Sequence, residues 1–273
     1  MKTIIRFSLT ALALSAATTV QAARPVEFTV GTEYYNENYR EYTNGTERVM
    51  RQKGNLWSLN GGVKYRFNER HAAKIEGRYS RGKTDYIGAY QEQPYGSLTL
   101  DGSPRRVYDV RALYEYTRPV KEGMNIVLSG GIGHRVLRDL NSRIVSSDYD
   151  RKNQTTYAQI SAGMNIALPN QFEVSPRIAY NQMLNGNQYS YLRNTEAVKM
   201  KQHRGKGIEI DVPVSKKFSN ESKLSVGPFY RGWKVFDSDL SNEVRNPIQN
   251  TLHTFYEPKN YTHEAGLKLQ YSF

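Results

Sequence analysis

The last thirteen residues, Tyr261 to Phe273, read YTHEAGLKLQYSF and decide the fold. From Ala265 to the end of the chain every second residue is apolar, namely Ala265, Leu267, Leu269, Tyr271 and Phe273. The intervening positions hold glycine, lysine, glutamine and serine. Successive side chains of a β-strand point to opposite faces, so this stretch predicts a strand with one apolar face. Such a strand is not stable alone and needs neighbours with the same pattern.

Nine earlier segments carry the same alternation. With the last one, the expected strands cover residues 26–34, 57–67, 73–79, 108–116, 126–132, 158–168, 172–180, 208–214, 224–230 and 265–273. The connections alternate strictly in length. The short, turn-rich ones are 68–70, 118–123, 169–171 and 219–221, and the long polar ones are 41–53, 87–105, 138–154, 185–203 and 237–259. Because ten is an even number, both ends of the chain should lie on the side of the short turns.

These features predict an all-β fold, a closed antiparallel transmembrane β-barrel of about ten strands. Short turns on one side and long loops on the other are typical of outer-membrane barrels. A secreted β-sandwich is the alternative, but it would have shorter strands and no alternation of connection lengths. Pro176, Pro213 and Pro228 fall inside expected strands and lack the N–H of a ladder position, so we expect a bulge or bend at each.

The N-terminus predicts export. Lys2 and Arg6 precede an apolar run over residues 7–17, and Val20-Gln21-Ala22 is a small-residue cleavage site. We therefore expect a signal peptide over residues 1–22 and a barrel over residues 23–273. No later run approaches the roughly 20 apolar residues of a spanning helix. The formal charge of +12 includes Lys2 and Arg6, so the mature chain carries 12 − 2 = +10.

Composition narrows the functional classes. A hydrophobic content of 38% and a mean hydropathy of -0.70 are compatible with a barrel, which exposes only alternate residues to lipid. The absence of cysteine excludes a disulfide scaffold and a thiolate metal site. No Walker, Rossmann or zinc-site spacing occurs, so we expect no cofactor and no metal. The basic residues follow strand parity and loops in an exported chain, and nucleic acid is not implied.

The signal, the ten segments and the terminal Tyr-Ser-Phe resemble small porin-like bacterial outer-membrane β-barrel proteins across residues 23–273. The resemblance implies a location in the outer membrane, contact with its lipids and lipopolysaccharide, and insertion by an assembly machinery that recognises the C-terminal strand. It also implies passive solute entry, without naming a solute. The oligomeric state stays open.

The predicted lumen carries opposed charges. We expect a basic wall and an acidic wall formed by Arg66, Arg78, Arg111, Arg177 and Arg231 against Glu209 and Asp211. If the walls face each other across a wet gap, the barrel is a narrow channel for small solutes, among them anions. If the side chains interlock, the barrel is filled by ion pairs and does not conduct, because ten strands lie near the filled end of barrel sizes. The sequence leaves both hypotheses open.

Two further classes concern the outer rim. Omptin proteases are ten-stranded barrels with an Asp-x-His pair opposite two aspartates; this chain has the aspartate pairs Asp148/Asp150 and Asp237/Asp239 but no Asp-x-His. We therefore expect no enzyme, although omptin-like or lipid-modifying activity stays open. The fourth long loop is basic through Arg193, Lys199, Lys201 and Arg204, with His203 and Lys206 beside them. Such a loop would bind lipopolysaccharide phosphates or another acidic surface ligand.

Overall fold

The computed structural model describes residues 25–44, 46–90, 93–145, 148–192, 197–246 and 251–273. The predicted signal peptide lies outside these residues. The strands are β1 (Val26–Thr43), β2 (Glu47–Arg66), β3 (His71–Gly88), β4 (Leu98–Lys121), β5 (Met124–Leu140), β6 (Asp150–Ala167), β7 (Phe172–Val174), β8 (Arg177–Tyr191), β9 (Val198–Gln202), β10 (Gly205–Asp211), β11 (Val214–Lys217), β12 (Lys223–Val235), β13 (Val244–Asn246), β14 (Thr251–His253) and β15 (Lys259–Ser272). Two short 3-10 turns are η1 (Asn141–Arg143) and η2 (Pro169–Gln171).

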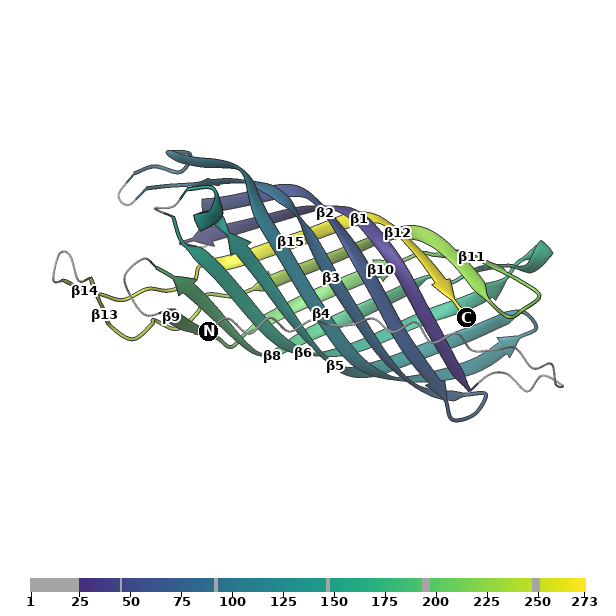
Figure 1. Cartoon of the computed structure of the whole chain (residues 1–273). Coiled ribbons are helices and arrows are strands. Elements are labelled where there is room, and N and C mark those ends of the chain that lie inside the picture. The colour runs from purple at the N-terminus through teal and green to yellow at the C-terminus, as the bar shows by residue number, and fades with distance from the viewer. Residues whose placement is uncertain (1–24, 45, 91–92, 146–147, 193–196, 247–250) are drawn as a thin grey trace, which may run out of the picture.

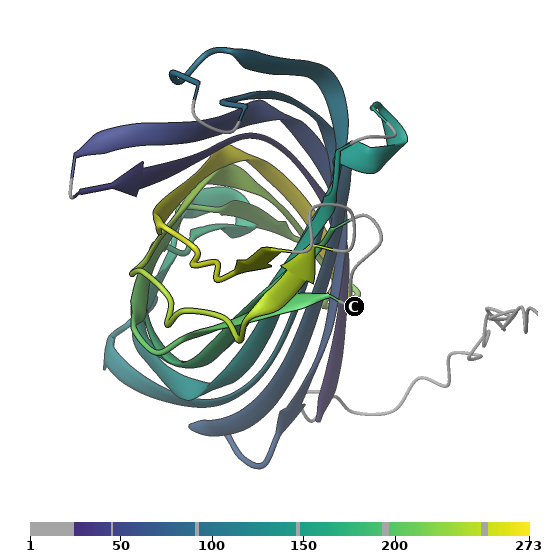
Figure 2. The ribbon, with the colours of Figure 1, turned by 90° about the vertical axis from the view of Figure 1, so that its left-hand side faces the viewer.

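The wall is a closed antiparallel barrel. From β1 to β6 each strand pairs with the next. The wall continues from β6 through β7 and β11, and through β8 and β10, to β12. Because β15 pairs with both β12 and β1, the sheet closes on itself. Thr32 of β1 lies opposite Leu59 on one side and Leu269 on the other. Figure 1 shows the tilted strands from the side, and Figure 2 shows them from the end that carries β13 and β14. The predicted all-β, ten-stranded barrel is confirmed, with β7 plus β8 and β10 plus β11 each forming one interrupted strand.

The predicted facing of the strands is also confirmed. Outward apolar side chains such as Ile75, Ile160 and Leu267 are 60%, 64% and 61% exposed, whereas inward Glu209 and Glu264 are 3% and 1% exposed. At the end of the short turns, aromatic rings gather on the outer wall: Phe28 and Phe273 stack with centroids 5.9 Å apart. The outward apolar residues form a belt around the barrel, which we call the apolar band. It begins at Phe273 at this end and ends at Tyr34, Trp57 and Tyr108 at the other.

The three prolines behave differently. Pro176 separates β7 from β8 and Pro213 separates β10 from β11, as expected for residues without a ladder N–H. The expected bulge at Pro228 is wrong, because β12 continues through it in register with β15. The reason lies in the neighbouring strand. The Val212 N–H donates to the Pro228 carbonyl over 3.1 Å. The carbonyl and the missing N–H of Pro228 point to the same neighbouring strand, and that strand is interrupted at Pro213. The missing N–H therefore breaks no ladder bond.

Most of the long loops are shorter than predicted. Strands β1 to β6 continue through much of 41–53, 87–105 and 138–154, and 185–203 is largely β8 and β9. Beyond the apolar band the outward residues become polar, so the alternation that marks a lipid-facing strand disappears. The barrel therefore extends well past the band at the end opposite the short turns, which we call the long-loop end. Among the described residues, no helix is long and apolar enough to cross a membrane.

Candidate functional site

The lumen brings the predicted basic and acidic residues into direct contact. Arg111 donates to Glu209 over 2.9 Å and Arg177 to Asp211 over 3.1 Å. These contacts bridge the basic and the acidic wall, because the guanidinium groups reach the carboxylates. A carboxylate facing an arginine in a space from which water is largely excluded is satisfied only by such charge-assisted hydrogen bonds.

A second set of pairs crosses the middle of the lumen, which we call the central ion-pair layer. Arg231 of β12 donates to Glu33 of β1 over 2.7 Å, and Arg78 of β3 donates to Glu264 of β15 over the same distance. Arg135 reaches Glu264 over 3.0 Å. All five side chains are at least nine-tenths buried. These contacts join strands on different parts of the wall and fill its interior.

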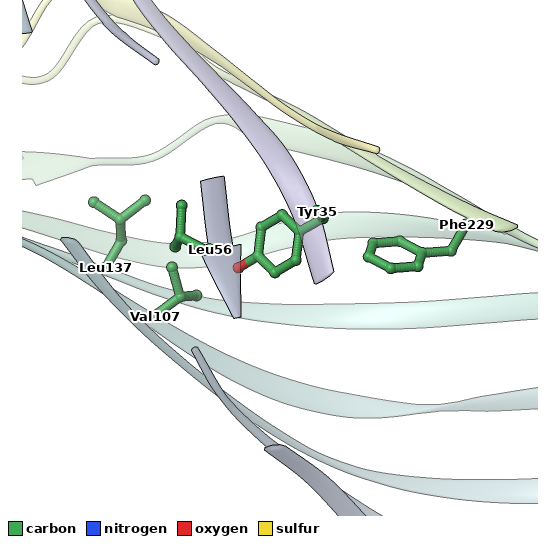
Figure 3. Packing of buried hydrophobic residues seen from close by; sticks show 5 residues of the cluster. All are labelled: Tyr35, Leu56, Val107, Leu137 and Phe229. Carbon is green, nitrogen blue, oxygen red and sulfur yellow. The ribbon is translucent and has the colours of Figure 1, made fainter. Parts of the chain in front are cut away.

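An apolar layer lies among the charged groups. It consists of Tyr35, Leu56, Val107, Leu137 and Phe229. Each of them is 4% exposed or less. Figure 3 shows these side chains, from five different strands, directed towards the interior of the barrel. The Tyr35 and Phe229 rings meet edge to face with centroids 5.8 Å apart. Apolar constrictions of this kind block ions because water does not wet them.

A third charged layer seals the long-loop half. Arg105 is fully buried and donates to Glu37 over 2.6 Å, and it also contacts Asp139. Arg151 donates to Asp139 over 3.2 Å and to Glu41 over 2.5 Å. The Arg105 guanidinium also lies over the Tyr39 ring at 4.9 Å. We call this set the outer ion-pair layer.

Neither the apolar layer nor the outer ion-pair layer was predicted, yet the sequence carries a signal for the former. Each member of the apolar layer adjoins an outward apolar residue, in the doublets Tyr34-Tyr35, Leu56-Trp57, Val107-Tyr108, Val136-Leu137 and Phe229-Tyr230. A strand with one apolar face has no reason for such a doublet. Where such doublets occur, the wall is apolar on both faces, so consecutive apolar residues in five strands indicate an apolar cluster inside the barrel.

The short-turn half of the lumen is open by comparison. A cavity of about 190 Å³, here called the vestibule, is lined by residues near the ends of the short-turn strands, including Lys64, Lys74, Glu115 and Lys223. Arg66, predicted as part of the basic wall, pairs with Glu27 at this end instead of with Glu209. The side chains of Arg66 and Glu27 are 34% and 25% exposed, so water reaches them. By contrast, the cavity within the central ion-pair layer measures only about 50 Å³.

The predicted loop residues form part of the wall. Lys199 and Lys201 face outward from β9, and Arg204 follows that strand with its guanidinium 5.0 Å from the Phe236 ring. Arg193 lies outside the described residues. The basic character is therefore presented on the outer surface of the barrel at its long-loop end, and not on a free loop.

The comparisons with known proteins agree with this architecture. The family model "Outer membrane protein beta-barrel domain" matches residues 7–199, which is more than half of the chain. The chain belongs to this outer-membrane β-barrel family. A search of curated protein sequences gave no match.

Solved structures show the same fold. The outer membrane protease OmpT from Escherichia coli superposes with a TM-score of 0.62 at 10% identity, over 94% of this chain and 100% of that one. The outer membrane protein OprG from Pseudomonas aeruginosa gives 0.40 at 8% identity, covering 89% and 95% of the two chains. At these identities the likeness extends to the fold alone. The family match, and not these superpositions, indicates that the barrel lies in the outer membrane.

One histidine–aspartate pair occurs at the long-loop end of this outer-membrane barrel. His203 Nε2 lies 2.7 Å from Asp239 Oδ2, and both side chains are about 60% exposed, at 61% and 59%. A search for Asp-x-His could not find it, because the partners are 36 residues apart. Asp150 accepts from Ser142 over 2.7 Å, so it serves a local turn. Within the described part of the chain, no group of three or more His, Asp or Glu could hold a metal ion.

Proposed function

We propose that the protein is a closed outer-membrane barrel that acts by binding a ligand at the cell surface, and not by conducting solutes at rest. The apolar layer carries this proposal. It lies in a lumen that also holds buried ion pairs, such as Arg105 with Glu37 and Arg231 with Glu33. An ion would have to shed water at the apolar layer and break pairs that each cost roughly 3–5 kcal/mol to disrupt.

The surface function follows from what remains accessible. With the long-loop half of the lumen filled, a ligand from outside meets only the outer wall and the loops. Basic outward residues of the long-loop end, among them Lys199 and Lys201, favour an anionic ligand such as lipopolysaccharide. We further propose that the assembly machinery of the outer membrane recognises β15, whose outward Leu267, Leu269 and Phe273 are all exposed.

A narrow channel that opens on a signal is the second candidate, and the vestibule favours it. The charged residues that line the vestibule are Lys64, Lys74, Arg177 and Lys223 against Glu27 and Glu115, which gives 4 − 2 = +2. A basic entry chamber of this size suits small anions. On this hypothesis the apolar layer is the gate.

Conductance across a planar bilayer decides between the two candidates. The refolded mature protein should give no single-channel steps under conditions in which a general porin does. Replacing Leu56 and Val107 together by serine should wet the apolar layer and allow an ionic leak. Discrete steps from the unaltered protein would contradict the closed barrel and support the channel. A silent double variant would mean that the two ion-pair layers close the lumen without the apolar layer.

A second double substitution tests the ion pairs of the lumen, one in the central ion-pair layer and one beside it. Exchanging Arg78 and Arg111 for glutamine leaves Glu264, Glu209 and Glu76 without these partners. In a filled lumen the barrel should lose stability and stay silent. In an open pore the same exchange should shift ion preference towards cations while stability stays near normal. Equilibrium unfolding in urea and single-channel recording separate these outcomes.

A further inference from the structure

Four cations stand in one row across the outer wall of β3 to β6, beyond the apolar band. Arg81 lies opposite Arg106, Arg106 opposite Arg138, and Arg138 opposite Lys152. All four point outward, and Arg81 and Arg138 are exposed. We call this row the cation ladder. Lys152 Nζ lies 4.3 Å from the centroid of the Tyr189 ring, and Tyr189 pairs with Lys199, so the row continues to β9.

Such a row is unfavourable without a counter-charge. Like charges directly opposite each other on one face of a sheet repel and destabilise it. Among the described residues, none of the four ladder side chains has a carboxylate within 4.0 Å, whereas most inward arginines have one or two. The chain therefore places four adjacent cations where only a molecule outside the barrel can neutralise them.

An apolar groove lies directly below the ladder, on the side of the membrane. Its volume is about 470 Å³, and apolar surface dominates its lining. Tyr79 and Tyr108 stand one outward position below Arg81 and Arg106, with their ring centroids 5.0 Å apart. The remaining outward residues of the groove are Leu59, Gly61, Gly77, Val110, His134 and Val136.

Two glycines keep this groove open. Gly61 and Gly77 lie opposite each other on β2 and β3. A Cβ at Gly61 would come no closer than 3.4 Å to any atom, and one at Gly77 no closer than 4.0 Å. Packing of the barrel therefore does not require glycine at either position. Their effect is to leave space on the lipid-facing surface, where an apolar side chain would otherwise stand.

We propose that this wall binds a phosphorylated lipid of the outer leaflet, lipopolysaccharide, with its phosphates on the cation ladder and an acyl chain in the groove. The long loops of outer-membrane barrels are extracellular, so the ladder stands at the height of the outer head groups. Arginine and lysine bind phosphate by charge-assisted hydrogen bonds. With strands roughly 4.8 Å apart, four cations span about 14 Å, which suits two separate phosphates better than the single phosphate of a phospholipid. The inference rests on the proposed surface function and names its ligand.

The ladder is tested by binding lipopolysaccharide to the refolded mature protein in detergent. Exchanging Arg106 and Arg138 together for glutamine should raise the dissociation constant at least tenfold. The matched control exchanges Lys121 and Lys217 for glutamine, which removes the same charge at the short-turn end and should change it less than twofold. Equal effects of the two double variants would overturn the proposal.

A matched pair of variants tests the groove separately. Gly77→Leu fills it and should weaken lipopolysaccharide binding several-fold. Gly130→Leu places the same side chain outward on β5, where a Cβ would meet nothing closer than 3.6 Å. Gly130 does not line the groove, so this control variant should leave binding unchanged. Equal binding by wild type and Gly77→Leu would overturn the acyl-chain site.

Two further readouts complete the test. Binding of phosphatidylglycerol as strong as that of lipopolysaccharide would overturn the choice of lipid, since it would show that any anionic lipid suffices. In lipid-free detergent the double variant of Arg106 and Arg138 should unfold no earlier than wild type, because repulsion is relieved. Earlier unfolding would assign these arginines a structural role and overturn the proposal. Conductance depends on the lumen, whereas lipopolysaccharide binding depends on the outer wall. A result that overturns the lipid site can therefore be distinguished from one that overturns the closed barrel.

Discussion

The two halves of the lumen use the same residue types but differ in what surrounds them. At the long-loop end, Arg105 and Glu37 are both 0% exposed and belong to the outer ion-pair layer. At the short-turn end, the side chains of Lys217 and Glu173 are 51% and 8% exposed, and the pair borders water. A buried charge depends on its partner far more than an exposed one does. The comparison shows that burial, and not the number of charges, distinguishes the sealed part of the lumen from the wet part.

The largest expected effect comes from breaking the sealed half. Arg105→Met removes the nearest partner of Glu37, which keeps only Arg135 at 4.0 Å, and one partner of Asp139. This change should cost roughly 3–5 kcal/mol of unfolding free energy. Lys217→Met is the matched change in the wet half; Glu173 keeps Lys223 at 3.6 Å, and we expect a loss within about 1 kcal/mol. Urea unfolding of the refolded protein measures both. Similar losses would mean that the two halves are equally hydrated.

The outer wall provides a second comparison between two levels of the barrel. Ile210→Arg places a charge on the lipid-facing side of β10 within the apolar band, which costs roughly 2–4 kcal/mol near the bilayer midplane. Asn55→Arg on β2 lies beyond the band, among outward polar residues, and should change stability by less than about 0.5 kcal/mol. Ser175→Arg, which faces the vestibule, should also be milder than Ile210→Arg. Refolding yields in vesicles and unfolding midpoints test the order.

The facing of residues within the ten predicted segments could be predicted from the sequence, because a period of two fixes orientation once one face is apolar. Arg78, Arg111 and Glu209 were therefore placed inside correctly. Their partners could not be predicted. Arg231 and Glu33 are 198 residues apart, and whether they meet depends on strand tilt and stagger, which no local pattern encodes.

The length of the strands was missed for a different reason. Beyond the apolar band the wall no longer meets lipid, so residues such as Arg81 and Lys83 are found where apolar ones would mark a strand. The inward parity keeps a weaker signal through Tyr35, Glu37, Tyr39 and Glu41, which are all buried. Polar side chains on both faces resemble a loop in sequence, although they form a wall that extends beyond the membrane.

A last and smaller effect concerns the closure of the long-loop end. Glu257, in the connection between β12 and β15, contacts β1: the Tyr39 hydroxyl oxygen lies 3.0 Å from Glu257 Oε1 and 2.9 Å from Glu41 Oε1. One phenol carries only one proton, so it cannot donate to both carboxylates. Burial, and then the charge of Glu41, raise the pKa of Glu257 well above its ordinary value of 4.5. We therefore expect Glu257 to keep a proton that completes these contacts and holds the connection against β1.

The sign of the pH dependence follows from that raised pKa. The folded contact binds a proton more tightly than the free side chain, so its stabilisation is complete below pH 4.5 and is lost as pH rises through the raised pKa of Glu257. Hydrogen exchange reports this directly, because the Ser238 N–H donates to the Glu257 carbonyl over 3.0 Å and the Glu257 N–H donates to the Ser238 hydroxyl over 2.8 Å. Protection of these two amides should fall with rising pH beyond the intrinsic increase in exchange rate. Glu257→Gln keeps a neutral donor at the site and should abolish the fall, whereas Glu243→Gln, an exposed acid of the same connection, should leave it unchanged. If wild type and Glu257→Gln respond alike, the proton is not shared, and the connection is held by its backbone contacts alone.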